Sequence, residues 1–159
     1  PWDMPPQYWT RQPEFFTQDW RKHPMYMDKS CEVVPVFERV IKGWGDLMES
    51  HGYRRGAGSD GRPGYIYDVL PRTEKKQTIA LFCHHGLGTS LIAAITGIPL
   101  PLCWKSFVLP TTSVTTVLME EHPAFPGHPQ AHIIGVGDES HLYAGGEPIS
   151  QSAIFCPIE

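Results

Sequence analysis

Two adjacent histidines and a glycine, His84-His85-Gly86, are the residues best placed for chemistry. They follow an apolar run at 77–83 and precede a stretch at 89–96 with the composition of a helix. The start of a helix presents free backbone N–H groups and a partial positive charge. Histidines at such a start, beside a glycine that lets a ligand approach closely, could bind an oxyanion or a phosphate. The alternative is that both histidines cap the strand and bond nearby backbone.

Three other phosphate or nucleophile loops do not fit the same stretch. A dinucleotide-binding fingerprint needs a glycine three residues after Gly88, where Leu91 stands. A Walker loop needs Gly-Lys-Ser/Thr, which the sequence lacks. A cysteine phosphatase loop would have an arginine six residues after Cys83, where Thr89 stands. The stretch therefore lacks the cation that would hold a phosphate beside a nucleophilic cysteine.

Histidines in the last third of the chain are candidates for metal ligands. They are His122, His128, His132 and His141. Zinc accepts imidazole ligands, but the spacing matches no compact zinc motif. Pro129 also breaks any helical face shared by His128 and His132. We therefore expect solvent-exposed loop histidines and no metal site.

A pair of carboxylates precedes one of these histidines. Asp138-Glu139 stands directly before Ser140-His141. A carboxylate near a histidine can form an acid–base pair. A turn in which Asp138 bonds its own backbone is the favoured interpretation.

Hydrophobic patterning predicts the elements that would position these residues. Apolar residues recur at spacings of three and four over 31–50, which predicts a helix that ends before Gly52. The glycine- and arginine-rich stretch 54–64 predicts a loop, and 65–70 predicts a short strand. The nearly continuous apolar run 77–83 predicts a buried parallel strand covered on both faces.

The two ends of the chain have different patterns. Two β-branched stretches, 112–119 and 131–136, predict an antiparallel hairpin at one edge of a sheet, with a loop at 120–130. The aromatic-rich residues 1–30 predict irregular segments and short helical turns that pack by their rings, although they could also line a substrate mouth. With no linker and no repeat, residues 1–159 are expected to form one α/β unit.

Composition limits the classes of function. The chain has 159 residues, 41% apolar and 19% charged, which is the range of globular domains. Its net charge is −4 and no basic cluster stands out, so we expect no nucleic-acid partner. No apolar run reaches the ~18 residues of a membrane helix, so we expect no membrane association. Cys83 and Cys103 have apolar neighbours and no C-x-x-C spacing, which predicts buried thiols in a reducing cytoplasm.

The stretch from Ile79 to Gly97 resembles the second-histidine motif of the histidine phosphatase superfamily, the phosphoglycerate-mutase-like proteins. In that family a buried strand ends in Ser/Cys-His-x-Gly and a helix follows at once. Residues 112–117 resemble the family's next strand, and 137–142 resemble an ending in which a strand runs into a His-Leu pair. The order and spacing of these blocks agree with the family over residues 31–143.

The resemblance implies a three-layer α/β/α sandwich and phosphomonoester hydrolysis or phosphoryl transfer. A first histidine, in an Arg-His-Gly motif, attacks the phosphoryl group and forms a phosphohistidine. His84 matches the second histidine, which stabilises the charge of the transferring group. His85 and Gly86 would then lie near the phosphate, and Ser113 and His141 are possible pocket residues. The resemblance implies no metal and no dissociable cofactor.

The sequence departs from the family at the nucleophile. It contains no Arg-His-Gly motif. Because it opens with Pro1 and not Met, we expect the chain to be the C-terminal part of the fold. The missing N-terminal half, or a second chain, would supply the nucleophile and complete the sheet.

Three further expectations follow from this departure. The chain alone should be inactive on the phosphorylated small molecules that the resemblance implies as substrates. A sheet left incomplete would tend to aggregate or to need its other half. The alternative function is a non-catalytic module that binds a phosphorylated ligand or a partner on the same fold. The sequence leaves the oligomeric state open.

Overall fold

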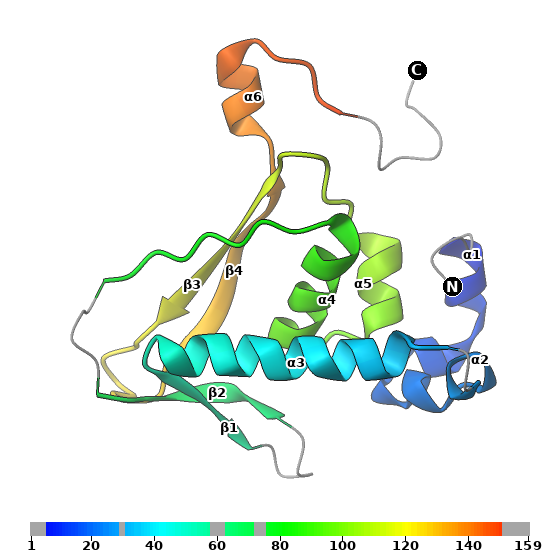
Figure 1. Ribbon diagram of the computed structural model, residues 1–159, viewed down its shortest axis with the longest axis horizontal. Helices are drawn as coiled ribbons and strands as arrows, with labels where there is room; N and C mark the ends of the chain where they lie inside the picture. The colour runs from blue at the N-terminus through cyan, green and yellow to red at the C-terminus, as the bar shows by residue number, and fades with distance from the viewer. Residues whose placement is uncertain (1–5, 29–30, 58–62, 72–75, 151–159) are drawn as a thin grey trace.

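The protein combines short and long helices with one four-stranded sheet (Figure 1). The computed structural model describes residues 6–28, 31–57, 63–71 and 76–150. The helical elements in order are α1 (Pro6–Arg11), η1 (Pro13–Phe16), η2 (Gln18–Lys22), α2 (Pro24–Met27), α3 (Val33–Ser50), α4 (His85–Thr96), α5 (Leu100–Ser106) and α6 (Ser140–Gly145). The strands are β1 (Tyr53–Ala57), β2 (Pro63–Val69), β3 (Val114–Glu120) and β4 (Gln130–Asp138). The predicted mixture of helices and strands is confirmed.

The sheet has the order β1-β2-β4-β3, and its described strand pairs are all antiparallel. β3 and β4 form a hairpin in which Val114 lies opposite Asp138 and Glu120 lies opposite Gln130. The predicted hairpin at a sheet edge is therefore confirmed, since β3 is an edge strand. β2 joins this hairpin near Ile66, and the Tyr67 amide donates to the Pro129 carbonyl at 3.1 Å.

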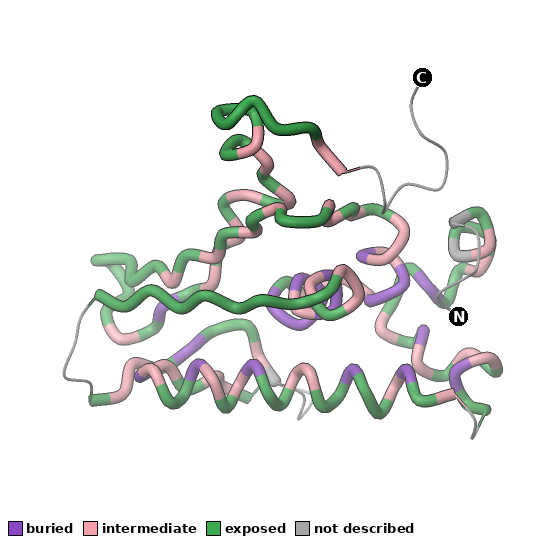
Figure 2. Tube along the Cα trace, turned by 45° about the horizontal axis from the view of Figure 1, so that its top comes forward, coloured by how far each residue is buried: buried purple, intermediate pink, exposed green. Residues whose placement is uncertain are grey.

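Helix α3 matches the helix predicted over 31–50. Its buried side chains, Val33, Phe37, Trp44 and Met48, lie on one side of the helix, and Figure 2 shows the opposite side exposed. The helix ends before Gly52, whose φ of 89° lies in the left-handed region that glycine adopts without strain. The 3.6-residue period of the sequence thus set the position and the buried face of this helix.

Three of the N-terminal aromatic residues belong to the core. Phe15, Trp20 and Tyr26 are buried, and the rings of Trp20 and Tyr26 meet edge to face with centroids 5.2 Å apart. Trp20 also lies 5.7 Å from the ring of Phe37 on α3. The Gln18 side-chain amide donates to the Gly97 carbonyl at 2.7 Å. The prediction of short helical turns that pack by their rings is confirmed.

A second core cluster joins α3, β2 and α4. Trp44, Met48, Tyr67 and Ile95 are its buried members. The Trp44 indole N–H donates to the Tyr67 hydroxyl at 2.7 Å inside this cluster. Burial raises the pKa of Tyr67, so the hydroxyl stays neutral and can accept this bond.

The glycine- and arginine-rich stretch 54–64 was predicted to be a loop, and this is wrong for its first and last residues, which belong to β1 and β2. β1 runs to Ala57 and pairs with β2, while residues 58–62 lie outside the described residues. Arg55 explains the difference, because its guanidinium donates to the carbonyls of Gly64 and Ala94 at 2.5 and 2.6 Å. These bonds hold β1 against β2 and α4, beside the partly buried Tyr53, which packs against the second core cluster. The strand predicted at 65–70 is confirmed as part of β2.

The predicted buried parallel strand at 77–83 is also wrong. These residues are extended but exposed, and no strand is assigned to them (Figures 1 and 2). A strand forms only when neighbouring strands satisfy its backbone groups. The described sheet ends at β3 and gives this segment no neighbour. An apolar run predicts a buried strand, but a strand is buried in a sheet only where neighbouring strands pair with it.

The hydrogen bond between Trp44 and Tyr67 provides a test of this core. Tyr67→Phe leaves the indole N–H buried without its acceptor, so unfolding should become easier by about 1–3 kcal/mol. Urea denaturation followed by tryptophan fluorescence measures the change. Tyr143→Phe is the matched control, since Tyr143 is exposed and its loss should cost at most about 0.5 kcal/mol. Equal stability of the two variants would contradict a stabilising role for this bond.

Candidate functional site

His84 lies at the N-cap of α4, at the junction between the extended segment and the helix. Its backbone is extended, with φ −78° and ψ 160°, and its side chain makes no capping hydrogen bond. The amides of Leu87 and Gly88 donate to the His84 carbonyl at 3.1 and 3.0 Å. The amides of His85 and Gly86 come before the first amide that is bonded within the helix. The helix itself therefore does not use these two donors, and they can bind a ligand. The exposed His84 side chain stands beside them.

The two adjacent histidines have different environments. The His85 Nδ1 atom accepts a hydrogen bond from the Leu109 amide at 3.2 Å, which fixes this ring against the loop after α5. His85 is half-buried, whereas His84 is exposed. This bond orients the His85 ring and leaves its Nε2 without a hydrogen bond to a described residue, whereas the His84 side chain makes no capping hydrogen bond.

Helix α4 begins four residues earlier than the predicted helix at 89–96. The Thr89 and Ser90 hydroxyls donate back to the carbonyls of His85 and Gly86, at 3.0 and 2.7 Å. These two buried hydroxyl groups are therefore bonded to the backbone of the helix and are not available to a ligand. Gly88 also permits close packing, because a Cβ at this position would lie 2.5 Å from the Leu109 side chain.

The loop before β3 and the end of β4 lie near the start of α4. Leu109 contacts His85 and Gly88, as described above. The preceding residue, Val108, lies against Gly137, where a Cβ would stand 3.1 Å from the Val108 carbonyl oxygen. Val108 and Leu109 therefore link Gly137, near the end of β4, to the start of α4.

Ser113 and His141 are not joined to His84 by any hydrogen bond among the described residues. Ser113 is half-buried, and its amide donates to the Pro110 carbonyl at 3.1 Å. His141 is exposed on α6, which stands away from α4 in Figure 1.

Asp138 forms the turn that the sequence favoured. Its Oδ1 accepts from the Ser140 amide at 2.8 Å, and its Oδ2 accepts from the Ser140 hydroxyl at 3.2 Å. These hydrogen bonds, with a smaller contribution from His141, lower the pKa of Asp138 below its usual value. Asp138 thus caps the start of α6, and the interpretation as a turn is confirmed.

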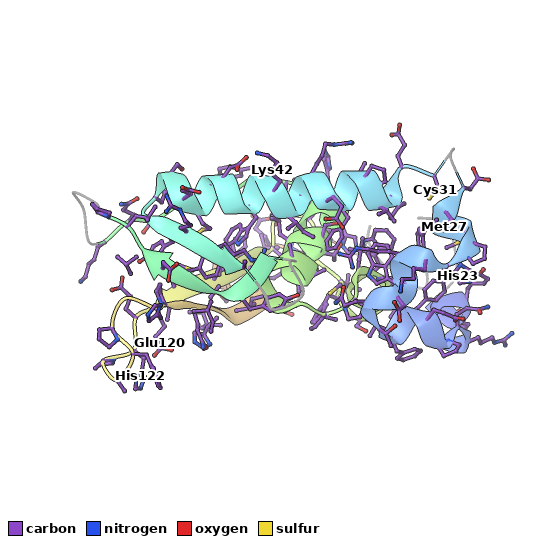
Figure 3. All side chains as sticks on the ribbon, turned by 90° about the horizontal axis from the view of Figure 1, so that it is seen from below. His23, Met27, Cys31, Lys42, Glu120 and His122 are labelled. Atoms are coloured by element: carbon purple, nitrogen blue, oxygen red, sulfur yellow. The ribbon has the colours of Figure 1, made fainter. Side chains whose placement is uncertain are left out.

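A hollow of about 530 Å³ lies at the opposite end of the sheet from His84. It is lined by Ile66, Glu120, His122, Phe125, His128, Gln130 and His132. His132 Nε2 lies 3.0 Å from a Glu120 oxygen, and His128 Nδ1 lies 3.1 Å from Asp68. Figure 3 shows Glu120 and His122 at one end of the molecule and His23 at the other.

This hollow was missed by the sequence analysis. His132 lies on β4 and not in a loop, although it is exposed as expected. The alternation along β4 places Gln130 and His132 on one face of the sheet, which a period of two could predict, but Glu120 comes beside them only through the register of β3 on β4. Within the described ranges, no three histidine, cysteine or acidic side chains are arranged to hold a metal ion.

Comparisons with known proteins add no further residues to this site. No protein-family model, curated protein or solved structure matches the chain. In residues 6–28, 31–57, 63–71 and 76–150, no helix is long and apolar enough to cross a membrane. The site is therefore interpreted from its own geometry and from the sequence motif.

The cysteines near the site differ in accessibility, and this corrects one prediction. Cys103 is buried as predicted, but Cys83 is exposed because the segment that carries it is exposed. Burial raises the pKa of the Cys103 thiol to about 12. Cys156 lies outside the described residues.

Thiol labelling tests this difference. We expect iodoacetamide to modify Cys83 in the folded protein, whereas Cys103 should react only after unfolding because its thiolate is absent and inaccessible. Peptide mass spectrometry before and after addition of urea identifies each site. Similar labelling of the two thiols in the folded protein would contradict the described burial.

Proposed function

We propose that this chain supplies the second active-site histidine of a phosphatase or mutase that works through a phosphohistidine. The observation that carries the proposal is the exposed, uncommitted His84 ring at the N-cap of α4. The Cys-His-His-Gly motif resembles that of histidine phosphatases in leading directly into a helix, although no strand is assigned before it. His84 is proposed as the reacting member because it matches the family's second histidine, while the Leu109 amide orients the neighbouring His85 ring.

The start of α4 has the electrostatics that a phosphoryl group needs. The helix dipole gives its N-terminus a partial positive charge, and the His85 and Gly86 amides are free donors. Gly86 has no side chain that would keep an oxyanion away from these amides. A protonated His84 would add a charge-assisted hydrogen bond to an oxygen of the transferring group. Fixed donors of this kind stabilise charge that develops in the transition state.

The nucleophile must come from outside the described site. No Arg-His-Gly motif occurs in the 159 residues. In the proposed assembly, an N-terminal half or a second chain provides the nucleophilic histidine and the acid that protonates the leaving group. The proposed reaction requires no metal and no dissociable cofactor, and a phosphorylated small molecule is the proposed substrate. A cytoplasmic location remains part of this proposal.

The proposed complete fold is a three-layer α/β/α sandwich. Val117, Met119, Ala131 and Ile133 of the hairpin pack against the cluster formed with α3 and α4. The other face of the hairpin exposes the apolar residues Val114, Leu118, Ile134 and Val136. An uncovered apolar face of this kind supports a further layer on that side. The second candidate function, a phospho-ligand or partner-binding module, uses the same site and needs no nucleophile.

Anion binding at the start of α4 is the first prediction. Titration of the ¹⁵N-labelled chain with inorganic phosphate should shift the His85 and Gly86 amide resonances. His84→Ala should weaken this binding about tenfold because it removes one charge-assisted donor. His122→Ala is the control, since it removes an exposed histidine at the other end of the sheet. Saturating phosphate without shifts at these two amides would contradict the site.

Turnover separates the enzyme from the binding module. The chain alone should release no phosphate from p-nitrophenyl phosphate above a His84→Ala control, because it lacks the nucleophile. In an assembly that hydrolyses this substrate, His84→Ala should lower kcat by about 10²–10³ while the fold survives. Steady-state kinetics and circular dichroism measure the two properties. Unchanged turnover in that variant would rule out His84 as a catalytic residue, and phosphate binding without any turnover would favour the binding module.

A further inference from the structure

The hollow at the far end of the sheet lies where the β1–β2 pair separates from the β3–β4 hairpin. β2 pairs with β4 at Ile66 and Gln130, and both side chains line the hollow. Beyond this pair the connection between β3 and β4 runs back beside β2, where the Val69 amide donates to the Gly127 carbonyl at 3.0 Å. Three strands and a loop therefore surround one space. Its volume of about 530 Å³ is within the usual range of small-molecule sites.

The charges at the hollow are already paired with one another. Glu120 Oε2 lies 3.0 Å from His132 Nε2, and Asp68 Oδ1 lies 3.1 Å from His128 Nδ1. Neither carboxylate is left without an imidazole to hold a cation, and neither imidazole is an isolated charge that would hold an anion. Because recognition requires complementary charge, a neutral ligand fits this balance best.

The remaining polar groups of the lining offer both hydrogen-bond donors and acceptors. The His122 Nδ1 atom accepts from the Ala124 amide at 3.1 Å, so the ring proton is on Nε2, which is a donor. The Gln130 side-chain amide forms no hydrogen bond with another described residue, and it carries a donor and an acceptor side by side. Such an amide pairs with a ring nitrogen next to an exocyclic amine, as on the edge of adenine. Figure 3 shows His122 at the same end of the molecule as Glu120.

Apolar side chains supply the surface on which a flat ring can stack. Phe125 is 69% exposed and Ile66 is 53% exposed, and both line the hollow. The ring centroids of His122 and Phe125 are 6.5 Å apart, which places the imidazole donor beside the phenyl ring. Aromatic side chains stack on planar heterocycles of many kinds, because each such ring has a π-face. A planar ligand could therefore stack on Phe125 while its edge meets Gln130.

The hollow lies beyond the apolar part of the sheet face on which a further layer is proposed. On the exposed face of β4, Ile134 is followed toward the hollow by His132, and on the same face of β3, Leu118 is followed by Glu120. A further layer would pack on the apolar residues, whereas covering the His132–Glu120 pair would cost the hydration of both groups. The hollow is therefore accessible whether or not that layer is present.

We propose that this hollow binds a neutral, planar heterocycle of the purine type, stacked on Phe125 and hydrogen-bonded through its edge to Gln130. The His122 Nε2–H group donates to a further ring nitrogen of the ligand. The inference stands apart from the proposed phosphatase function, because it depends on the lining of the hollow and not on His84.

Adenosine is the probe for this site. Titration of the ¹³C,¹⁵N-labelled chain should shift the Gln130 side-chain amide and the Phe125 ring resonances, with saturation in the millimolar range. Phe125→Ala removes the stacking surface and should weaken binding about tenfold. Tyr143→Ala is the matched control, because Tyr143 is an equally exposed aromatic residue, 70% against 69%, but lies on α6 outside the hollow. This control should bind adenosine like the unchanged chain, and circular dichroism should show that both variants are folded.

N6,N6-Dimethyladenosine tests the hydrogen bonds to the edge of the ring. It lacks the N–H donors of the exocyclic amine, so the unchanged chain should bind it about tenfold more weakly than adenosine, whereas Gln130→Ala should bind the two nucleosides alike. Resonance shifts confined to the start of α4, equal weakening in Tyr143→Ala, or no saturation with adenosine in the millimolar range would each overturn the proposal. Benzyl alcohol bound as tightly as adenosine, or Zn²⁺ bound at the hollow without any binding of adenosine, would overturn it as well.

Discussion

The burial of α4 is the constraint on which the rest of the structure depends. This helix contacts α3, α5 and β4, and it contributes Ile92, Ala93 and Ala94 to one core cluster and Ile95 to the other. Its small residues let its neighbours approach closely, and interiors tolerate few gaps. Because its body is fixed on several sides, its first turn is fixed as well. The position of the His84 backbone follows from this packing and from the contacts of Leu109 with His85 and Gly88 in the first turn.

The elements that could be predicted from the sequence are those whose pattern is local. The period of α3 and the β-branched residues of the hairpin identify their own structures. β1 was not predicted, because Arg55 holds it through hydrogen bonds to Gly64 and Ala94, residues that no local pattern relates to it. The 77–83 run was assigned to the interior because an apolar pattern cannot show whether a neighbouring strand exists.

The candidate site was only partly predictable for the same reason. Its place at the start of a helix follows from the glycines and the apolar run that surround the histidines. The different environments of His84 and His85 could not be predicted in this way. They depend on the Leu109 amide, which lies twenty-four residues after His85 in the chain. The hollow around His132 needs the register of β3 on β4, which brings Glu120 beside residues of the other strand. Contacts between distant residues therefore determine the finer chemistry.

The aromatic N-terminal segment also bears on where this protein can be shortened. Trp20 lies on Phe37, and Gln18 reaches the carbonyl of Gly97 at the end of α4. A chain that started at residue 31 would keep every strand of the sheet but would expose the inner face of α3. It would also expose Leu100 and Cys103, which belong to the same buried cluster. The segment therefore supplies part of the core cluster that α4 and α5 share with the start of α3.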